Sequence, residues 1–122
     1  MLGDMRVHTM FGKVALALSL SAIFPVHITA AQEDLDSANY VIKGCREFIA
    51  LSRSDYLKQG LCIGAVKAIV KNYPGLCRPE QLPTEQAVRA VIAYIDSRPA
   101  RLQENFYSLA VEAIRSAWPC RR

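Results

Sequence analysis

Residues 45–62 read CREFIALSRSDYLKQGLC, and this stretch between two cysteines decides the fold. Its midpoint falls in the polar segment Ser52–Asp55, and apolar residues recur at helical spacing on both sides of that segment. Two residues at equal distances from a helix–helix turn lie side by side across an antiparallel pair of helices. The stretch therefore predicts a helical hairpin that a Cys45–Cys62 disulfide closes.

The other two cysteines, Cys77 and Cys120, repeat this relation over a longer stretch of chain. Their midpoint falls on Arg98-Pro99, and the residue before a proline is disfavoured in a helical conformation. A second turn between two helices is therefore expected at this point. We predict a second helical hairpin, closed by a Cys77–Cys120 disulfide.

The spacing of apolar residues predicts four helices in all. They cover about residues 37–51, 54–73, 84–97 and 101–118, with Ser37, Ser54 and Thr84 as N-caps of the first three. The second helix is apolar around most of its circumference, which is typical of a central helix in a bundle. The predicted fold class is all-α, a small four-helix bundle made of two disulfide-stapled helical hairpins.

Six residues are candidates for a surface that binds a partner. They are Gly60, Gly64 and Lys67 on the second predicted helix and Tyr107, Val111 and Trp118 on the fourth. The two glycines mark a place where something approaches the backbone closely, either another helix of the same chain, a partner protein or a second subunit. The residues of the fourth helix form an apolar stripe that either covers the flank of the core or binds a partner through its aromatic side chains.

Residues 1–31 are predicted to be a cleavable secretory signal peptide. Positively charged residues precede an uncharged run, Val14–Phe24, which is too short to span a bilayer comfortably. Small residues then precede an acidic segment, so cleavage is expected between Ala31 and Gln32. An uncleaved membrane anchor is the alternative, which the short run disfavours. The mature chain would be a single all-helical domain of residues 32–122, periplasmic and without membrane association.

The predicted mature chain lacks the residues that many catalytic sites need. Both histidines, His8 and His27, lie in the predicted signal peptide, which excludes a Ser–His or Cys–His nucleophile pair and a His-ligated metal. The cysteines form no Cys-x-x-Cys element of the kind common in zinc sites, and an oxidising compartment favours disulfides. We expect no enzymatic activity, no metal and no cofactor. Carboxylate catalysis stays open as an alternative, because acidic side chains are plentiful.

The charge of the chain bears on the class of its partner. The whole sequence has a net charge of +4, and loss of the signal peptide removes two basic residues and one acidic residue. The remaining positive charge is mild and is scattered along the chain, with Arg121-Arg122 as one small cluster. Nucleic acid is therefore not an expected partner.

The order and spacing of several short motifs resemble those of the Rap/Tai immunity domain family. The motifs are Cys45, Gly60-Leu-Cys62-Ile-Gly64, Cys77-Arg-Pro79-Glu, Gln86…Val91…Tyr94, Ser97-Arg-Pro99, Leu109-Ala-Val-Glu-Ala-Ile114 and Ala117-Trp-Pro119-Cys120. The resemblance covers about residues 38–120. It implies a small, exported, all-helical and disulfide-bonded protein that protects a bacterium against type VI secretion effectors, of which the associated ones are peptidoglycan amidases.

The function expected from the sequence follows from the signal peptide, the cysteines and this resemblance. We expect a periplasmic immunity-type protein that binds a cell-wall-degrading effector hydrolase, a peptidoglycan amidase, and neutralises it by surface association. A homodimer is the other association considered. The alternative function is that of a small periplasmic structural or stress-protective helical protein without a cognate toxin.

Overall fold

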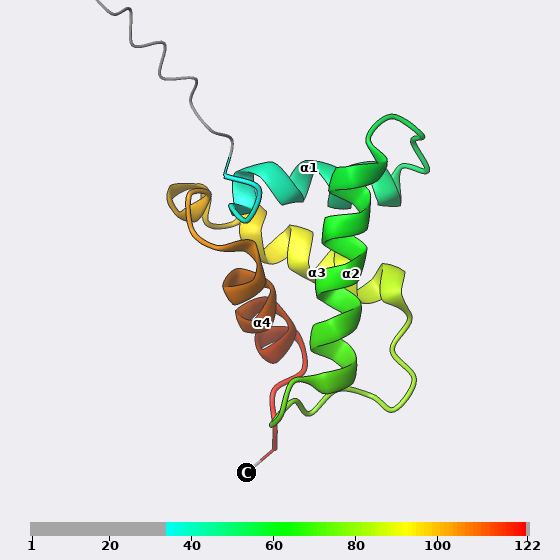
Figure 1. The fold of residues 1–122 in the computed structure, drawn as a ribbon. Helices are drawn as coiled ribbons and strands as arrows, with labels where there is room; N and C mark the ends of the chain where they lie inside the picture. The colour runs from blue at the N-terminus through cyan, green and yellow to red at the C-terminus, as the bar shows by residue number, and fades with distance from the viewer. Residues whose placement is uncertain (1–33, 122) are drawn as a thin grey trace, which may run out of the picture. The chain divides into compact units, whose positions relative to one another are not determined.

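The computed structural model of the chain describes residues 34–121, and these residues form four α-helices and one short 3-10 helix. The elements are α1 (Ala38–Ile49), α2 (Tyr56–Asn72), α3 (Thr84–Asp96), η1 (Pro99–Arg101) and α4 (Phe106–Ala117) (Figure 1). The predicted all-α fold with four helices and two disulfides is confirmed. The predicted signal peptide and its cleavage position between Ala31 and Gln32 lie outside the described residues.

The helix starts correct three details of the sequence prediction. Ser37 caps α1 as expected, because its hydroxyl accepts a hydrogen bond from the amide of Tyr40. The N-cap of α2 is Asp55 rather than Ser54, since the Asp55 carboxylate accepts from the amide of Lys58 at 3.0 Å. A carboxylate is a stronger acceptor than a hydroxyl at the positive end of a helix.

The other two corrections concern α3 and α4. Thr84 is the first residue of α3, and the N-cap is Pro83, which makes no side-chain cap hydrogen bond. Helix α4 begins at Phe106 instead of residue 101, because Pro99–Arg101 form the 3-10 helix η1. Asn105 then caps α4, with its side-chain oxygen accepting from the amide of Ser108 at 3.1 Å.

Helices α1 and α2 pack closely at Gly44. A Cβ atom at this position would lie 2.1 Å from the carbonyl carbon and oxygen of Lys58 and 2.5 Å from the amide nitrogen of Gln59. The next residue, Cys45, is fully buried and forms the predicted disulfide with the equally buried Cys62, with a Cα–Cα distance of 5.3 Å. Glycine at position 44 therefore allows the close contact beside the disulfide.

Helix α2 packs against each of the other three helices, but so do α1, α3 and α4, so α2 is not distinguished as the central element. Its apolar residues are less buried than their number predicts, because only Cys62, Val66 and Ile69 are fully enclosed. Leu57, at the start of the helix, is 59% exposed. One side of α2 thus forms part of the core, and the opposite side presents small residues and lysines to solvent.

The second disulfide joins the chain just after α2 to the chain just after α4. Figure 1 shows the ends of these two helices close together near the C-terminus, and the predicted Cys77–Cys120 pair lies there with a Cα–Cα distance of 4.9 Å. Both cysteines are exposed and lie outside the helices. This disulfide encloses α3 and α4 in one covalent loop, but it does so from the flanking segments rather than from the helices themselves.

Candidate protein-binding surfaces

The predicted surface residues on α2 are all exposed. Gly60, Gly64 and Lys67 lie on the side of the helix opposite the buried Cys62 and Val66. Apart from the adjoining backbone of α2 itself and the two chain neighbours, no described atom lies within 4 Å of a Cβ built at either glycine. The alternative that these glycines receive a neighbouring helix of the same chain is therefore wrong for the described residues, and the close approach occurs at Gly44 instead.

The predicted surface residues on α4 are divided between surface and core. Tyr107 is 42% exposed, whereas Val111 is only 7% exposed and is not available to a partner. Val111 is buried because it flanks the face of α4 that carries Leu109, Ala110 and Ile114 into the core. Trp118, at the end of α4, is partly buried and packs against the core. The six predicted residues thus do not form one continuous surface.

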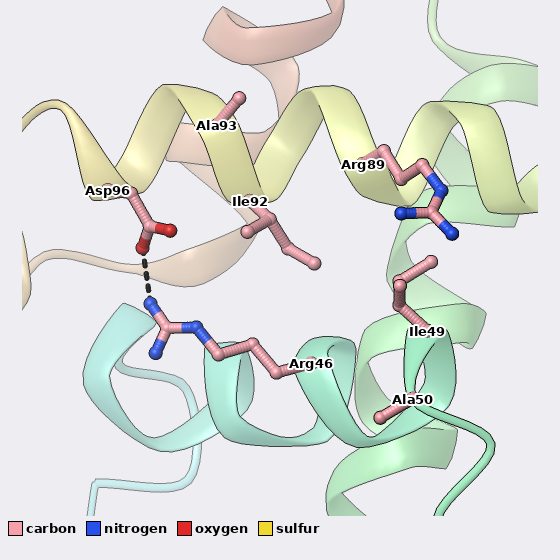
Figure 2. Close-up of a pocket in the computed structure, with 7 residues that line it drawn as sticks. All are labelled: Arg46, Ile49, Ala50, Arg89, Ile92, Ala93 and Asp96. Atoms are coloured by element: carbon pink, nitrogen blue, oxygen red, sulfur yellow. Dashed lines mark hydrogen bonds and ion pairs between the residues drawn. The ribbon is translucent and has the colours of Figure 1, made fainter.

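A groove of about 520 Å³ lies between α1 and α3, and the sequence did not predict it. Figure 2 shows Ile49 and Ile92 directed into the space between the two helices, with Ala50 and Ala93 nearby. An ion pair between Arg46 and Asp96 connects the helices at one end of the groove (Figure 2).

The charged side chains of this α1–α3 groove are already paired. Arg46 is bound to Asp96, and Arg89, at the other end of the groove, donates to the carboxylate of Glu85 at 2.7 Å. The remaining lining is formed by Ile and Ala side chains. The groove can therefore accept an apolar side chain, but its charges are satisfied within the described part of the chain.

The turn between α1 and α2 carries a concentration of exposed apolar side chains. Leu51 is 86% exposed, Tyr56 is 69% exposed and Leu57 is 59% exposed. These are three of the five large hydrophobic residues that are exposed in the described range, and they lie within seven consecutive positions. We name residues 51–57 the α1–α2 turn, and no other stretch of this length in residues 34–121 contains as many exposed large hydrophobic residues.

Leu51 also has an unusual backbone conformation. Its φ of 56° lies in the left-handed region, and it is the one non-glycine residue in residues 34–121 with a positive φ. The amide of Leu51 donates to the carbonyl of Phe48 at 3.2 Å, and the amide of Ser52 donates to the carbonyl of Glu47 at 3.0 Å. This is the Schellman hydrogen-bond pattern, in which glycine usually occupies the left-handed position. A leucine there costs roughly 1–2 kcal/mol.

The sequence contained a usable signal for this turn that the prediction missed. A helix that ends by a Schellman motif usually shows glycine just after its last turn, but residues 49–55 contain none. A Schellman ending therefore requires a non-glycine residue in the left-handed position, and the sequence does not say which residue this is. The apolar Leu51, Tyr56 and Leu57 around a polar segment were a second sign.

The connection between α3 and α4 is held by a network of charged groups. Arg101 donates to Glu112 at 2.7 and 3.0 Å and to Glu104 at 2.7 and 2.8 Å, and the hydroxyl of Tyr94 donates to Glu112 at 2.7 Å. The guanidinium of Arg98 lies over the ring of Tyr94 at 3.6 Å from its centroid. These contacts join the connection to Tyr94 of α3 at one end and to Glu112 of α4 at the other.

The same network sets the protonation states of its members. Hydrogen bonds from Arg101 and then from Tyr94 lower the pKa of Glu112 from its ordinary value of 4.5 to about 2. Hydrogen bonds from Arg101 also lower the pKa of Glu104, and both carboxylates raise the pKa of Arg101. Glu112 is therefore ionised at neutral pH, and its carboxylate joins Arg101 and Tyr94 across the α3–α4 connection.

Backbone hydrogen bonds tie this connection to the start of α1 as well. The amides of Ala38 and Asn39 donate to the carbonyls of Glu104 and Leu102, both at 2.8 Å, and the amide of Phe106 donates to the carbonyl of Asp36 at 2.7 Å. The described surface is thus fixed by disulfides, side chains and backbone hydrogen bonds in several places.

Two further properties of residues 34–121 concern membrane-spanning helices and metal-binding clusters. None of the helices in this range combines the length and apolarity needed to cross a bilayer. In the same range, no three His, Cys, Asp or Glu side chains come together in an arrangement that could hold a metal ion. The described surface carries apolar, basic and acidic side chains on a helical scaffold.

Comparison with known proteins identifies a family for the chain. The family model of the Rap1a immunity proteins matches residues 37–120, which covers all four helices and both disulfides. No curated protein and no solved structure shows significant similarity to the chain. The match extends over more than half of the sequence and agrees with the resemblance carried by the cysteine motifs, so the chain belongs to the Rap1a immunity protein family.

Proposed function

We propose that this protein is a periplasmic immunity protein that binds an incoming type VI peptidoglycan amidase and blocks it by surface association. The observation that carries the proposal is the family match over residues 37–120. An immunity protein of this kind acts stoichiometrically and needs no catalytic residue of its own. Its requirements are a stable fold, an accessible surface and a location where it meets the toxin.

The rigidity of the scaffold supports this mode of action. The two disulfides, the close contact at Gly44 and the Arg101–Glu112 network all restrict motion before a partner binds. A surface that is ordered in advance loses less conformational entropy on association, so more of the contact energy appears as affinity. This property suits an inhibitor that must capture an enzyme before it damages the cell wall.

The cysteines support export to the periplasm. All four pair in the structure, and disulfides form and persist in oxidising compartments such as the bacterial periplasm. The predicted signal peptide would deliver the chain to that compartment. A peptidoglycan amidase acts on the cell wall, so its inhibitor has to be present on the same side of the inner membrane.

Two measurements test the proposal. Purified protein from the periplasm of an expressing strain should abolish peptidoglycan cleavage by its cognate amidase at a one-to-one molar ratio. In cells that export the amidase, the full chain should restore growth, whereas a variant lacking residues 1–31 should not. Undiminished cleavage at a molar excess of the protein, or equal protection by the variant without residues 1–31, would contradict the proposal.

A further inference from the structure

The α1–α2 turn combines two features that oppose the stability of the free protein. Leu51 adopts a left-handed conformation that glycine would adopt without strain, and its side chain is 86% exposed. Tyr56 and Leu57, a few residues later, are also mostly exposed. A local concentration of exposed large apolar residues is typical of interaction sites on soluble proteins. A strained residue that contributes nothing to the core indicates a functional role.

The turn presents these side chains from a fixed backbone. The buried Cys45–Cys62 disulfide and the contact at Gly44 hold the two helices beneath it. The side-chain amide of Gln59 donates to the carbonyl of Ser52 at 2.9 Å, which joins the turn to the first part of α2. The backbone that carries Leu51 is therefore held by several contacts on both sides of the turn.

Charge on this side of the molecule indicates the chemistry of the partner. Arg53 is exposed in the middle of the turn and has no ion pair within residues 34–121. Lys67 and Lys71 are also exposed on α2, but they lie 11 and 15 residues after Tyr56, towards the other end of the helix.

The carboxylate within the turn, that of Asp55, does not pair with Arg53. Asp55 forms an ion pair with Lys58 at 2.9 Å, and hydrogen bonds from the backbone and side chain of Lys58 lower the pKa of the Asp55 carboxyl. On α1, the Oε2 atom of Glu47 is buried. A complementary partner surface would therefore combine an apolar hollow with carboxylates around it.

We infer that the α1–α2 turn is the element that binds the amidase, with Leu51 inserted into an apolar hollow of the enzyme and Arg53 facing carboxylates at its edge. This assignment rests on the proposed function and adds to it the contact segment and the chemistry of the receiving surface. Exposed large side chains on a rigid turn are the kind of anchor that dominates the energy of an interface.

The test uses a substitution that separates binding from folding. Leu51→Gly removes the anchor and relieves the left-handed strain, so the melting temperature should stay equal or rise. The affinity for a catalytically inactivated type VI amidase, measured by titration calorimetry, should fall at least tenfold. Tyr107→Ala removes another exposed aromatic side chain, on α4, and should change the affinity less than threefold.

A charge reversal provides the second arm. Arg53→Glu should lower the affinity about tenfold at low salt and reduce its dependence on salt concentration. Arg121→Glu changes the net charge by the same amount at the exposed C-terminal end and should have little effect. Amidases encoded in the same genome are the first probes.

The outcomes separate the two levels of the proposal. If the wild-type chain binds none of the amidases, the proposed function fails and the contact assignment fails with it. If the wild type binds but Leu51→Gly binds equally well, only the assignment to the turn is wrong. A third outcome also overturns the inference. Leu51→Gly could leave the amidase affinity unchanged but abolish self-association of the wild type, which would assign the turn to a second copy. If it instead abolished sedimentation with phosphatidylglycerol vesicles, the turn would be assigned to a membrane.

Discussion

The α1–α2 hairpin and the segment from residue 77 to residue 120 are each closed by one disulfide, yet the two disulfides lie in different environments. Cys45 and Cys62 are fully buried between two helices, whereas Cys77 and Cys120 are exposed in the segments that flank α3 and α4. The first closes a sequence separation of 17 residues and the second one of 43. The same covalent bond therefore has two structural roles in one small domain.

In the hairpin, the disulfide is part of the core. It lies beside Gly44, where the backbones of α1 and α2 approach too closely for any side chain. In the 77–120 segment, the helices are positioned by apolar packing and by the Arg101–Glu112 network, and the disulfide restrains the ends of the chain from outside. The first should therefore stabilise through packing and chain entropy, and the second through chain entropy alone.

Removal of each disulfide tests this distinction most directly. Chain entropy alone assigns about 3 kcal/mol to the 17-residue closure and about 4 kcal/mol to the 43-residue closure. Loss of two buried sulfur atoms adds roughly 2 kcal/mol at the first site. We therefore expect Cys45→Ala/Cys62→Ala to lose about 5 kcal/mol of unfolding free energy, measured in urea, and Cys77→Ala/Cys120→Ala to lose about 4 kcal/mol at most.

The test depends on which double variant loses more unfolding free energy. If burial of the sulfur atoms is unimportant, the variant without the 43-residue closure loses more. A larger loss for Cys77→Ala/Cys120→Ala would mean that both disulfides act only through the unfolded chain. A reduction experiment gives an independent reading on the wild type. Alkylation followed by mass spectrometry should detect Cys77 and Cys120 well before Cys45 and Cys62, since the reductant reaches exposed sulfur atoms first.

Substitution of Gly44 should have the next largest effect. Gly44→Ala places a Cβ atom 2.1 Å from backbone atoms of Lys58, and backbone cannot move aside as a flexible side chain can. We expect a loss of about 3 kcal/mol or more in thermal or urea unfolding. Gly64→Ala is the matched control, because it lies within α2 with open space around it and should gain about 1 kcal/mol. Equal effects of the two substitutions would show that the contact at Gly44 does not control the hairpin.

This contrast shows how far the sequence determined the fold. Cysteine spacing around polar turns predicted both pairings, because a hairpin places equidistant residues opposite each other. Apolar periodicity predicted all four helices, but it placed the start of α4 five residues too early, because Leu102 continues the helical spacing of Phe106 and Leu109 although residues 102–105 lie between η1 and α4. Periodicity records which face is buried, and it does not record where the hydrogen-bond pattern changes.

The candidate surface was predicted less well for a related physical reason. Three glycines lie within α1 and α2, but a sequence does not say which of them faces a neighbour: Gly44 meets a backbone, whereas Gly60 and Gly64 face open space. Val111 belongs to an apolar stripe of α4, and the sequence alone did not decide whether this stripe is buried against the core or exposed to a partner. The strain at Leu51 depends on its φ angle, which no composition argument supplies.

The two residues with positive φ provide a smaller test of the same comparison. Leu51 (φ 56°) ends the first helix of the hairpin, and Gly75 (φ 78°) lies between α2 and the exposed Cys77. Gly75→Ala should cost about 1 kcal/mol through backbone strain, since nothing surrounds the new Cβ atom. Leu51→Gly should gain roughly 0.5–1 kcal/mol, less than the full strain because glycine also makes the unfolded chain more flexible. Opposite signs in urea unfolding are the expected result, and a destabilised Leu51→Gly would mean that the exposed side chain contributes to the free fold.

Acid should weaken the α3–α4 half through Glu112, and this is the smallest effect that we expect. The pKa of Glu112 is about 2 in the folded chain and 4.5 without its partners, so its stabilisation is present above pH 4.5 and is lost as the pH falls towards 2. The side chain is 43% exposed, so solvent screening limits the contribution to about 1 kcal/mol or less. Glu112→Gln should therefore be slightly less stable at pH 7 and should lose less stability than the wild type between pH 5 and pH 2.

A second substitution identifies which partner of Glu112 matters most. Hydrogen bonds from Arg101 lower the pKa of Glu112 more than the hydrogen bond from Tyr94 does. Tyr94→Phe should therefore lose only a minor part of the stability that Glu112→Gln loses at pH 7. Carboxyl NMR chemical shifts report the titration directly and should give a pKa near 2 for Glu112 in the wild type and a somewhat higher one in Tyr94→Phe. A carboxyl that titrates near 4.5 in the folded wild type would show that Arg101 does not hold the α3–α4 connection in solution. Rigidity in that half would then depend on the exposed disulfide and the backbone hydrogen bonds to α1, and the contrast between the two regions would be sharper still.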